Sequence, residues 1–239
     1  MTTRVACLGD SITRAQLSVD YLGPLERRRP PGEVRLARFG VNGDFAHNLS
    51  RRLDAVVADP PDVITVLIGT NDARASLVGY PVERAMKRKQ LPERPSAGWF
   101  QECLAAVVER LRTQTDATIA LLSLPVLGQQ PDGAAAQASQ AYSRMIAEVA
   151  TTNKAAYLPL HERQTEELRR ADPPPIPYQE PTPASSVGVL VQRAVLRRDL
   201  DTVSRRRGLV LTTDHIHQNS RGAALVAEVI DAWLPTRSA

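Results

Sequence analysis

The sequence predicts an α/β fold in which helices cover both faces of a mainly parallel β-sheet. Short apolar runs typical of strands alternate with longer segments of helical periodicity along the chain. One of these runs, Val63–Ile68, is rich in β-branched residues and apolar or nearly so throughout, as expected for a strand buried on both faces. At 239 residues and 43% hydrophobic content, the chain can form one domain of this class.

Each element is predicted from its local pattern. Strands are expected at short apolar runs: Val5–Leu8, Val34–Val41, Val63–Ile68, Thr118–Leu124 and Ala156–Leu160. Helices are expected where apolar residues recur every three or four positions: Ala15–Arg29, Phe45–Ala58, Trp99–Arg112, Ala134–Thr152 and Ser220–Leu234. Because this spacing gives a helix one apolar side, each predicted helix can pack against the sheet.

Two stretches interrupt the alternation of strands and helices. Gly79–Ser96 is long and basic and holds three prolines, and Pro173–Pro183 holds six prolines in eleven residues. Since proline lacks a backbone N–H and restricts φ, the second stretch should be extended rather than helical. The following segment, Ser185–Arg207, is compatible with a helix that has an apolar stripe and an arginine-rich opposite side.

The composition excludes several classes of protein. The net charge is +4, but nearly all of the positive charge is arginine and no aromatic-plus-basic recognition module occurs, so we predict no nucleic-acid partner. No apolar run reaches the roughly 18 residues of a membrane-spanning helix. Met1–Arg4 leads directly into the first strand, which leaves no room for a signal peptide and predicts a cytoplasmic location. The oligomeric state cannot be read from the sequence.

Neither cysteine is expected to carry function. Cys7 lies in a strand-like run and Cys103 in a helix-like run, so both should be small buried apolar residues rather than halves of a disulfide framework. Neither has the cysteine or histidine spacing of a metal site. We therefore predict no metal, and no cofactor either, because the sequence has no G-x-G-x-x-G motif and no P-loop.

Four short motifs carry the functional signal. Three follow directly on the first three strand-like runs: Gly9-Asp10-Ser11-Ile12, Asn42-Gly43-Asp44 and Gly69-Thr70-Asn71-Asp72. The fourth, Asp214-His215-Ile216-His217, lies near the C-terminus. Since ligands of parallel sheets bind at the carboxyl ends of the strands, we expect the first three motifs to meet at one edge.

A serine, a histidine and an aspartate in these motifs fit acyl transfer through a serine nucleophile. A serine hydroxyl reacts only when an imidazole accepts its proton, and a carboxylate must orient that imidazole. Asp214 and His217 are three residues apart, which can bring the carboxylate beside the ring. His215 is the alternative histidine, but it lacks this spacing. Asn71 offers a side-chain donor suited to a developing oxyanion.

These motifs, in this order, resemble those of the SGNH (or GDSL) hydrolase superfamily. The resemblance implies a flavodoxin-like three-layer α/β/α sandwich that hydrolyses esters or thioesters. It also implies Ser11 as the nucleophile, His217 as the base and Asp214 as the group that orients His217. The backbone N–H groups of Ser11 and Gly43 and the amide of Asn71 would form the oxyanion hole.

Some assignments within the motifs stay open. Gly40 also follows the second strand, but Gly43 is preferred because Asn-Gly-Asp opens directly onto a helix. Two acidic residues, Asp10 and Asp72, are expected to stabilise local turns rather than react. Two further histidines, His47 and His161, are expected to lie on helices as bystanders.

The predicted function is hydrolysis of carboxylic esters, acyl or acetyl, through a Ser-His-Asp triad and an acyl-enzyme, with a small-molecule ester as substrate. An acyltransferase that uses the same acyl-enzyme is the first alternative, and a non-catalytic binding protein on this fold is the second. Residues 1–239 should form one domain with an insertion or cap at residues 173–207. In that cap, Val191 and Val195 would face the acyl group; packing away from the site or against another subunit is the alternative.

Overall fold

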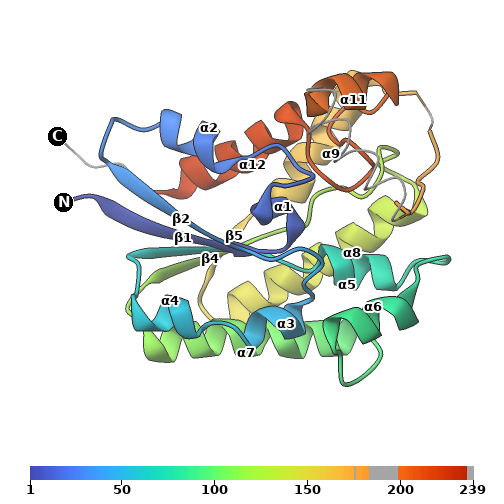
Figure 1. Cartoon of the computed structure of the whole chain (residues 1–239). Coiled ribbons are helices and arrows are strands. Elements are labelled where there is room, and N and C mark those ends of the chain that lie inside the picture. The colour runs from blue at the N-terminus through green and yellow to red at the C-terminus, as the bar shows by residue number, and fades with distance from the viewer. Residues whose placement is uncertain (175, 183–198, 236–239) are drawn as a thin grey trace.

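A computed structural model describes residues 1–174, 176–182 and 199–235 of the chain (Figure 1). Within these residues, five strands form one all-parallel sheet in the order β2-β1-β3-β4-β5. The strands, in chain order, are β1 Thr3–Gly9, β2 Val34–Gly40, β3 Val63–Leu67, β4 Thr118–Leu122 and β5 Ala156–Leu158. The predicted α/β class with a parallel sheet is therefore confirmed.

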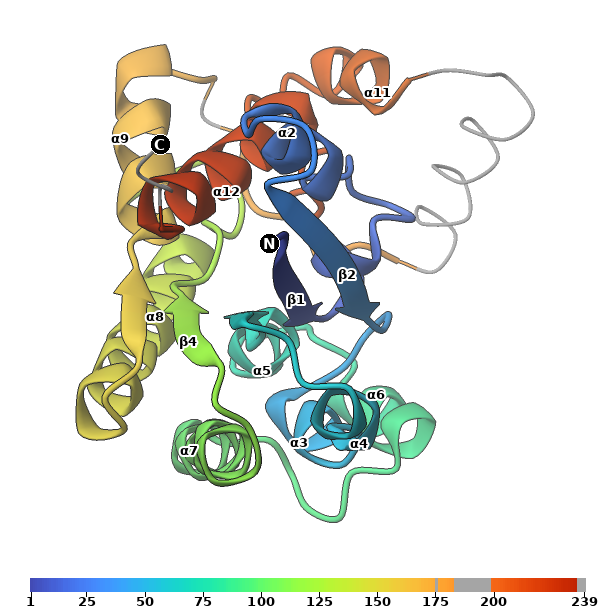
Figure 2. The same cartoon turned by 90° about the vertical axis from the view of Figure 1, so that its left-hand side faces the viewer.

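Helices cover both faces of the sheet and make the three layers visible in Figures 1 and 2. One face carries α3 Ala46–Ser50, α4 Asp54–Ala58, α5 Thr70–Ala75, α7 Ala97–Gln114 and α8 Ala134–Thr152. The other carries α1 Ser11–Arg14, α2 Leu22–Arg27, α9 Leu160–Ala171 and α12 Ser220–Trp233. Strand β1 shows why both faces need cover: Ala6 and Leu8 pack into one core and Val5 and Cys7 into the other.

Two predicted helices are wrong in extent. In place of one helix over Ala15–Arg29, α1 spans Ser11–Arg14 and is ended by Ala15, the next residue, whose φ of 59° is left-handed. The next helix, α2, begins only at Leu22. In place of one helix over Phe45–Ala58, α3 and α4 are separate. The turn between them lets the Arg52 side chain reach back to the sheet.

Three helices had no predicted bounds, and the first of them is the short α5 at Thr70–Ala75. Inside the proline-containing stretch Gly79–Ser96 lies α6 Val82–Lys89, which follows Pro81 and is ended by the next residue, Gln90, with φ 52°. Proline is tolerated just before a helix, so it did not prevent this one. The third, α9, is strongly polar and begins directly after Pro159; only its His161 was expected to lie on a helix. In α6 and α9, a charged surface dilutes the apolar repeat on which sequence prediction depends.

The predicted insertion is described only in part. Residues 173–182 form no helix or strand where they are described, as the prolines predict. Of the predicted segment Ser185–Arg207, the structure describes α11 Leu200–Arg206, whose Leu200 and Val203 pack against Leu17 and Val19. Val191 and Val195 lie outside the described residues. No helix in the described part of the chain is long and apolar enough to cross a membrane.

Candidate active site

Ser11 is the first residue of α1 and follows the carboxyl end of β1 after a tight turn. Asp10 caps this helix, because its side chain accepts a hydrogen bond of 2.9 Å from the Ile12 N–H. Gly9 is needed because a Cβ there would lie 2.3 Å from Thr13 Oγ1 and 2.5 Å from the Leu67 carbonyl oxygen. The turn therefore holds Ser11 at the carboxyl edge of the sheet.

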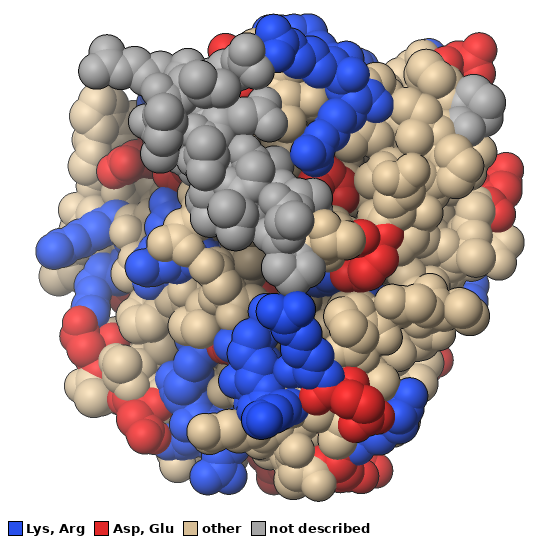
Figure 3. Space-filling model, turned by 45° about the vertical axis from the view of Figure 1, so that its right-hand side comes forward, with Lys and Arg blue, Asp and Glu red and all other residues tan. Residues whose placement is uncertain are grey.

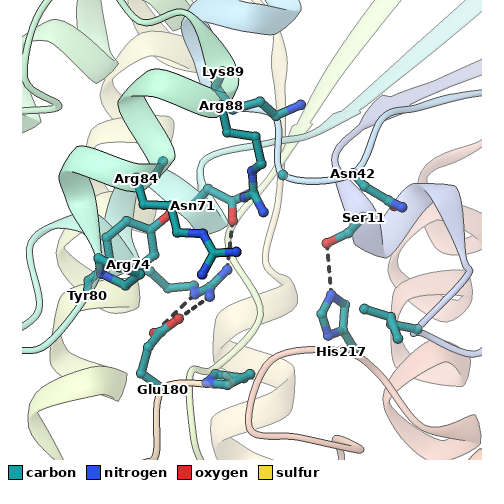
Figure 4. A pocket seen from close by; sticks show the side chains of 15 residues that line it. Ser11, Asn42, Asn71, Arg74, Tyr80, Arg84, Arg88, Lys89, Glu180 and His217 are labelled. Atoms are coloured by element: carbon teal, nitrogen blue, oxygen red, sulfur yellow. Dashed lines mark hydrogen bonds and ion pairs between the residues drawn. The ribbon is translucent and has the colours of Figure 1, made fainter. Parts of the chain in front are cut away.

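The Asp214–His217 loop brings a histidine to Ser11. Asp214 Oδ1 accepts hydrogen bonds from the backbone N–H groups of Ile216, at 3.2 Å, and His217, at 2.8 Å. Asp214 Oδ2 lies 2.7 Å from His217 Nδ1, and His217 Nε2 lies 3.0 Å from Ser11 Oγ (Figure 4). With the Nδ1 proton donated to the carboxylate, Nε2 is free to accept the serine proton.

The electrostatics of this loop favour an ionised aspartate. Burial raises the pKa of Asp214, but the His217 charge and the hydrogen bonds from His217 and Ile216 outweigh burial and lower it below its ordinary value. Only 4% of the Asp214 side chain is exposed and 8% of that of His217, so the pair is screened weakly by water. The carboxylate can therefore stabilise an imidazolium that forms beside it.

The structure brings His217, and not His215, to Ser11. The backbone of His215 is left-handed, with φ 71°, which turns its ring toward Tyr178 at 5.8 Å between ring centroids. Among the described residues, its buried Nδ1 has no hydrogen-bond partner. Burial also lowers its pKa, which keeps the ring neutral. His215 is thus a packing residue in this geometry.

Gly43 and Asn71 lie at the same edge as Ser11, and all three line one pocket with His217. Gly43 adopts φ 72°, a conformation that favours glycine. Gly40 instead ends β2 and packs on α1, because a Cβ there would lie 2.3 Å from the Arg14 nitrogen. Of the two glycines, Gly43 lines the pocket and Gly40 does not.

The Asn71 side chain is held in one orientation. Its Nδ2 donates to the Asp44 carbonyl oxygen at 2.9 Å, and its Oδ1 accepts from Arg74 Nη1 at 2.8 Å. This pattern assigns the amide nitrogen to the Asp44 side, and leaves the second Nδ2 proton for a ligand. Asn71 is only 3% exposed, so the orientation is fixed before any ligand binds.

The pocket beside Ser11 has a volume of about 420 Å³ and one strongly basic wall (Figures 3 and 4). We define this basic wall as Arg74 on α5 and Arg84, Arg88 and Lys89 on α6. Glu180 and Pro181 close the rim opposite α6. The sequence showed a basic stretch at α6 but no signal that it would face the active-site edge, because no helix was predicted there.

Asp10 and Asp72 are fully buried beneath the site. Burial raises the pKa of Asp10 to about 6 and that of Asp72 to about 7. Asp10 caps its own turn as predicted. Asp72 was predicted to stabilise a local turn, but its Oδ2 accepts from the Ala46 N–H at 3.2 Å and so joins α5 to α3.

The remaining candidate residues lie away from the pocket lining. His47 lies on α3, stacked on Trp99, and His161 lies on α9, with its Nδ1 3.3 Å from the Leu124 carbonyl oxygen. Cys7 and Cys103 are buried and unpaired. Across residues 1–174, 176–182 and 199–235, no group of three or more metal-ligating side chains is assembled.

The fold and this arrangement are those of an α/β serine hydrolase. Over residues 7–225, the sequence matches the GDSL-like Lipase/Acylhydrolase family. The chain belongs to this family, also called SGNH hydrolases, and is an acylhydrolase of the esterase type. A search of curated proteins returned no match.

Solved structures share the fold at low sequence identity. The acetyl xylan esterase AlAXEase is 19% identical with a TM-score of 0.70, and the match covers 97% of this chain and 100% of that one. Axe2, an acetylxylan esterase from Geobacillus stearothermophilus, is 16% identical with a TM-score of 0.66, over 98% of this chain and 97% of its own. These similarities confirm the three-layer SGNH-type fold.

Proposed function

We propose that the protein hydrolyses short-chain acyl esters, acetyl esters above all, of a polar alcohol through an acyl-enzyme on Ser11. The observation that carries this proposal is a pair of hydrogen bonds in series. One joins Ser11 Oγ to His217 Nε2 at 3.0 Å, and the other joins His217 Nδ1 to Asp214 Oδ2 at 2.7 Å. A serine, a base and an orienting carboxylate in this order activate the hydroxyl as a nucleophile.

In the first half of the reaction, Ser11 Oγ bonds to the ester carbonyl carbon while its proton passes to His217 Nε2. The N–H groups of Ser11 and Gly43 and the Asn71 amide stabilise the oxyanion that forms. His217 then returns the proton to the leaving alcohol oxygen as the C–O bond breaks. Water attacks the acyl-enzyme by the same route and releases the acid and free Ser11.

The residues that line the pocket favour a substrate with a short acyl group and a polar alcohol. Apolar lining comes from only a few residues: Leu17, Tyr80, Pro81, Ala85 and Pro181. A long acyl chain needs continuous apolar cover, since its binding depends on the area removed from water. The acetyl xylan esterase activity named for both structural neighbours supports the same substrate class. Three structures of Axe2 variants are described as catalytic mutants, with a serine, an aspartate or a histidine replaced.

We also propose that residues 173–207 act as an insertion in one domain and that their described part forms a rim of the substrate pocket. Glu180 and Pro181 line the pocket, and Glu180 forms an ion pair with Arg74. Tyr178 packs over Gly128, where an added Cβ would lie 3.5 Å from the ring. These contacts tie the proline-rich stretch to the active-site edge and support a rim.

A fluorophosphonate probe and a series of p-nitrophenyl esters test the function. The probe should label Ser11, and kcat/KM should be highest for acetate and fall as the acyl chain lengthens. Product analysis with added alcohols or amines separates hydrolysis from acyl transfer, because a transferase passes the acyl group to the acceptor in place of water. Labelling at another serine, or highest activity on long chains, would contradict the proposal.

A further inference from the structure

Two of the four cations in the basic wall have an anionic partner within the protein. Lys89 Nζ lies 2.7 Å from Asp44 Oδ1, and Arg74 pairs with Glu180. For Arg84 and Arg88 no hydrogen bond or ion pair is found within the described part of the chain, and both are exposed. Figure 4 shows their side chains extending from α6 into the pocket, across from Ser11 and His217.

The position of Arg88 is set close to the proposed oxyanion donor. A Cβ added to Gly43 would lie 3.0 Å from Arg88 Nη2, so this guanidinium rests directly over Gly43. The glycine thus leaves room for a cation beside the reacting centre. A ligand held by the oxyanion donors would have its remaining atoms within reach of α6.

The packing of α6 explains why these side chains point into the pocket. Its buried side carries Val82 and Ala85, and Ala85 packs with Phe45 and Leu91. Arg84 and Arg88 are four residues apart and lie on the same side of the helix, where like charges destabilise it. A bound anion would relieve this repulsion, and guanidinium groups can hold carboxylate or phosphate oxygens in bidentate fashion.

We propose that the natural ester substrate carries an anionic group, a carboxylate or a phosphate, that Arg84 and Arg88 bind. The inference rests on the proposed esterase function and narrows its substrate to anionic esters. The anionic group can belong to the alcohol part or to the acyl part, and the experiment below distinguishes these sources. The uncancelled positive charge of the wall also attracts such substrates over a distance.

The test uses esters that differ only, or mainly, in the charged group. On the alcohol side, 4-acetoxybenzoate is compared with its methyl ester, and 4-acetoxyphenyl phosphate with 4-methoxyphenyl acetate. On the acyl side, mono-4-nitrophenyl adipate is compared with methyl 4-nitrophenyl adipate. In at least one pair we expect kcat/KM to favour the anion by about 10-fold or more, and added salt to weaken this preference.

The variants assign the preference to the two arginines. The double variant Arg84→Gln/Arg88→Gln should lower the anion-to-neutral ratio of kcat/KM by about 10-fold or more, because each lost contact is a charge-assisted hydrogen bond. The matched control is Lys87→Gln, which removes one charge from the exposed side of α6 outside the pocket lining and should leave the ratio unchanged.

The pair that shows the preference identifies which part of the substrate is charged. If wild type labels at Ser11 and cleaves neutral esters but prefers no anionic ester, the anionic-substrate inference is wrong and the esterase proposal stands. A preference that survives in the double variant also overturns it. If Ser11 is not labelled and no ester is cleaved, the esterase proposal itself fails and the inference falls with it.

Discussion

The two sides of the pocket differ in how their polar groups are satisfied. On the triad side, Ser11, His217 and Asp214 are buried and bonded to one another in series. On the α6 side, Arg84 and Arg88 are exposed, with no anionic partner in the described residues. The first arrangement is complete without a ligand, as preorganised chemistry requires, whereas the second gains its partners only from a ligand. We therefore expect the triad side to react with the substrate and the α6 side to select it.

The largest effect should come from breaking the triad side at its first member. We expect Ser11→Ala to lower kcat on the order of 10⁵-fold or more, because no other group in the series can form the acyl-enzyme. Steady-state hydrolysis of p-nitrophenyl acetate and fluorophosphonate labelling measure this. Ser76→Ala, which removes a hydroxyl bonded only to its own helix, is the control. Residual labelling in Ser11→Ala would show that the nucleophile lies elsewhere.

Loss of the Asn71 amide should cause the second-largest reduction in kcat. By analogy with other oxyanion holes, Asn71→Ala should reduce kcat by about 10²–10³ while KM changes little, since the amide matters most once charge develops on the oxygen. Asn42→Ala, which truncates another amide in the pocket lining, should cost less. An effect confined to KM would place Asn71 among the groups that select.

The carboxyl group of Asp72 tests the interior behind the triad side. Burial raises its pKa from 3.8 to about 7, so the folded protein keeps a proton that the unfolded chain releases near pH 4. The free energy of unfolding should therefore fall as the pH rises from about 4 to about 7. In Asp72→Asn this part of the decline is absent.

Urea unfolding of both proteins across this pH range measures the effect. The difference in unfolding free energy between Asp72→Asn and wild type should shift in favour of the variant by about 2–3 kcal/mol from pH 4 to pH 8. This is somewhat less than the full three-unit pKa shift allows. Asp59→Asn, at a carboxyl that is 78% exposed, should follow the wild-type profile. Parallel profiles for Asp72→Asn and wild type would mean that Asp72 ionises normally in the folded protein.

The smallest effect concerns Glu180, the one carboxylate in the pocket lining. Glu180→Gln releases Arg74 from its ion pair and adds one positive charge to the basic wall. We expect kcat/KM for the preferred anionic ester to rise about threefold, with little change for its neutral counterpart. Glu83→Gln, which breaks an exposed pair with Arg94 outside the lining, is the control. An equal loss on both esters would show that Glu180 chiefly holds the rim in place.

The same contrast explains what the sequence could predict. The sheet was predictable because its strands are short apolar runs, and Ser11, Gly43 and Asn71 lie within a few residues of the ends of three of them. The Asp214–His217 spacing was informative because the Asp214 side chain accepts hydrogen bonds from the backbone of its own turn. In this part of the molecule, local sequence determines local geometry.

The basic wall could not be predicted in the same way. Its position depends on α6, a polar helix whose apolar contacts lie with Phe45 and Leu91 rather than with the main sheet. Glu180 meets Arg74 across 106 residues of sequence, and no motif marks either one. The break between α3 and α4 likewise follows from tertiary contacts of Arg52, which local periodicity does not report.

Those contacts of Arg52 have a consequence for thermal motion. Its guanidinium donates to the Gly9 carbonyl oxygen at 2.8 Å, to the Phe39 carbonyl oxygen at 3.0 Å and to Asp44 Oδ2 at 2.7 Å. Gly9 precedes the turn to Ser11, and Phe39 and Asp44 flank the loop that carries Gly43. One planar group thus fastens two loops, and we expect their fluctuations to be correlated. The distance between the backbone N–H groups of Ser11 and Gly43 should then vary less than the position of either loop.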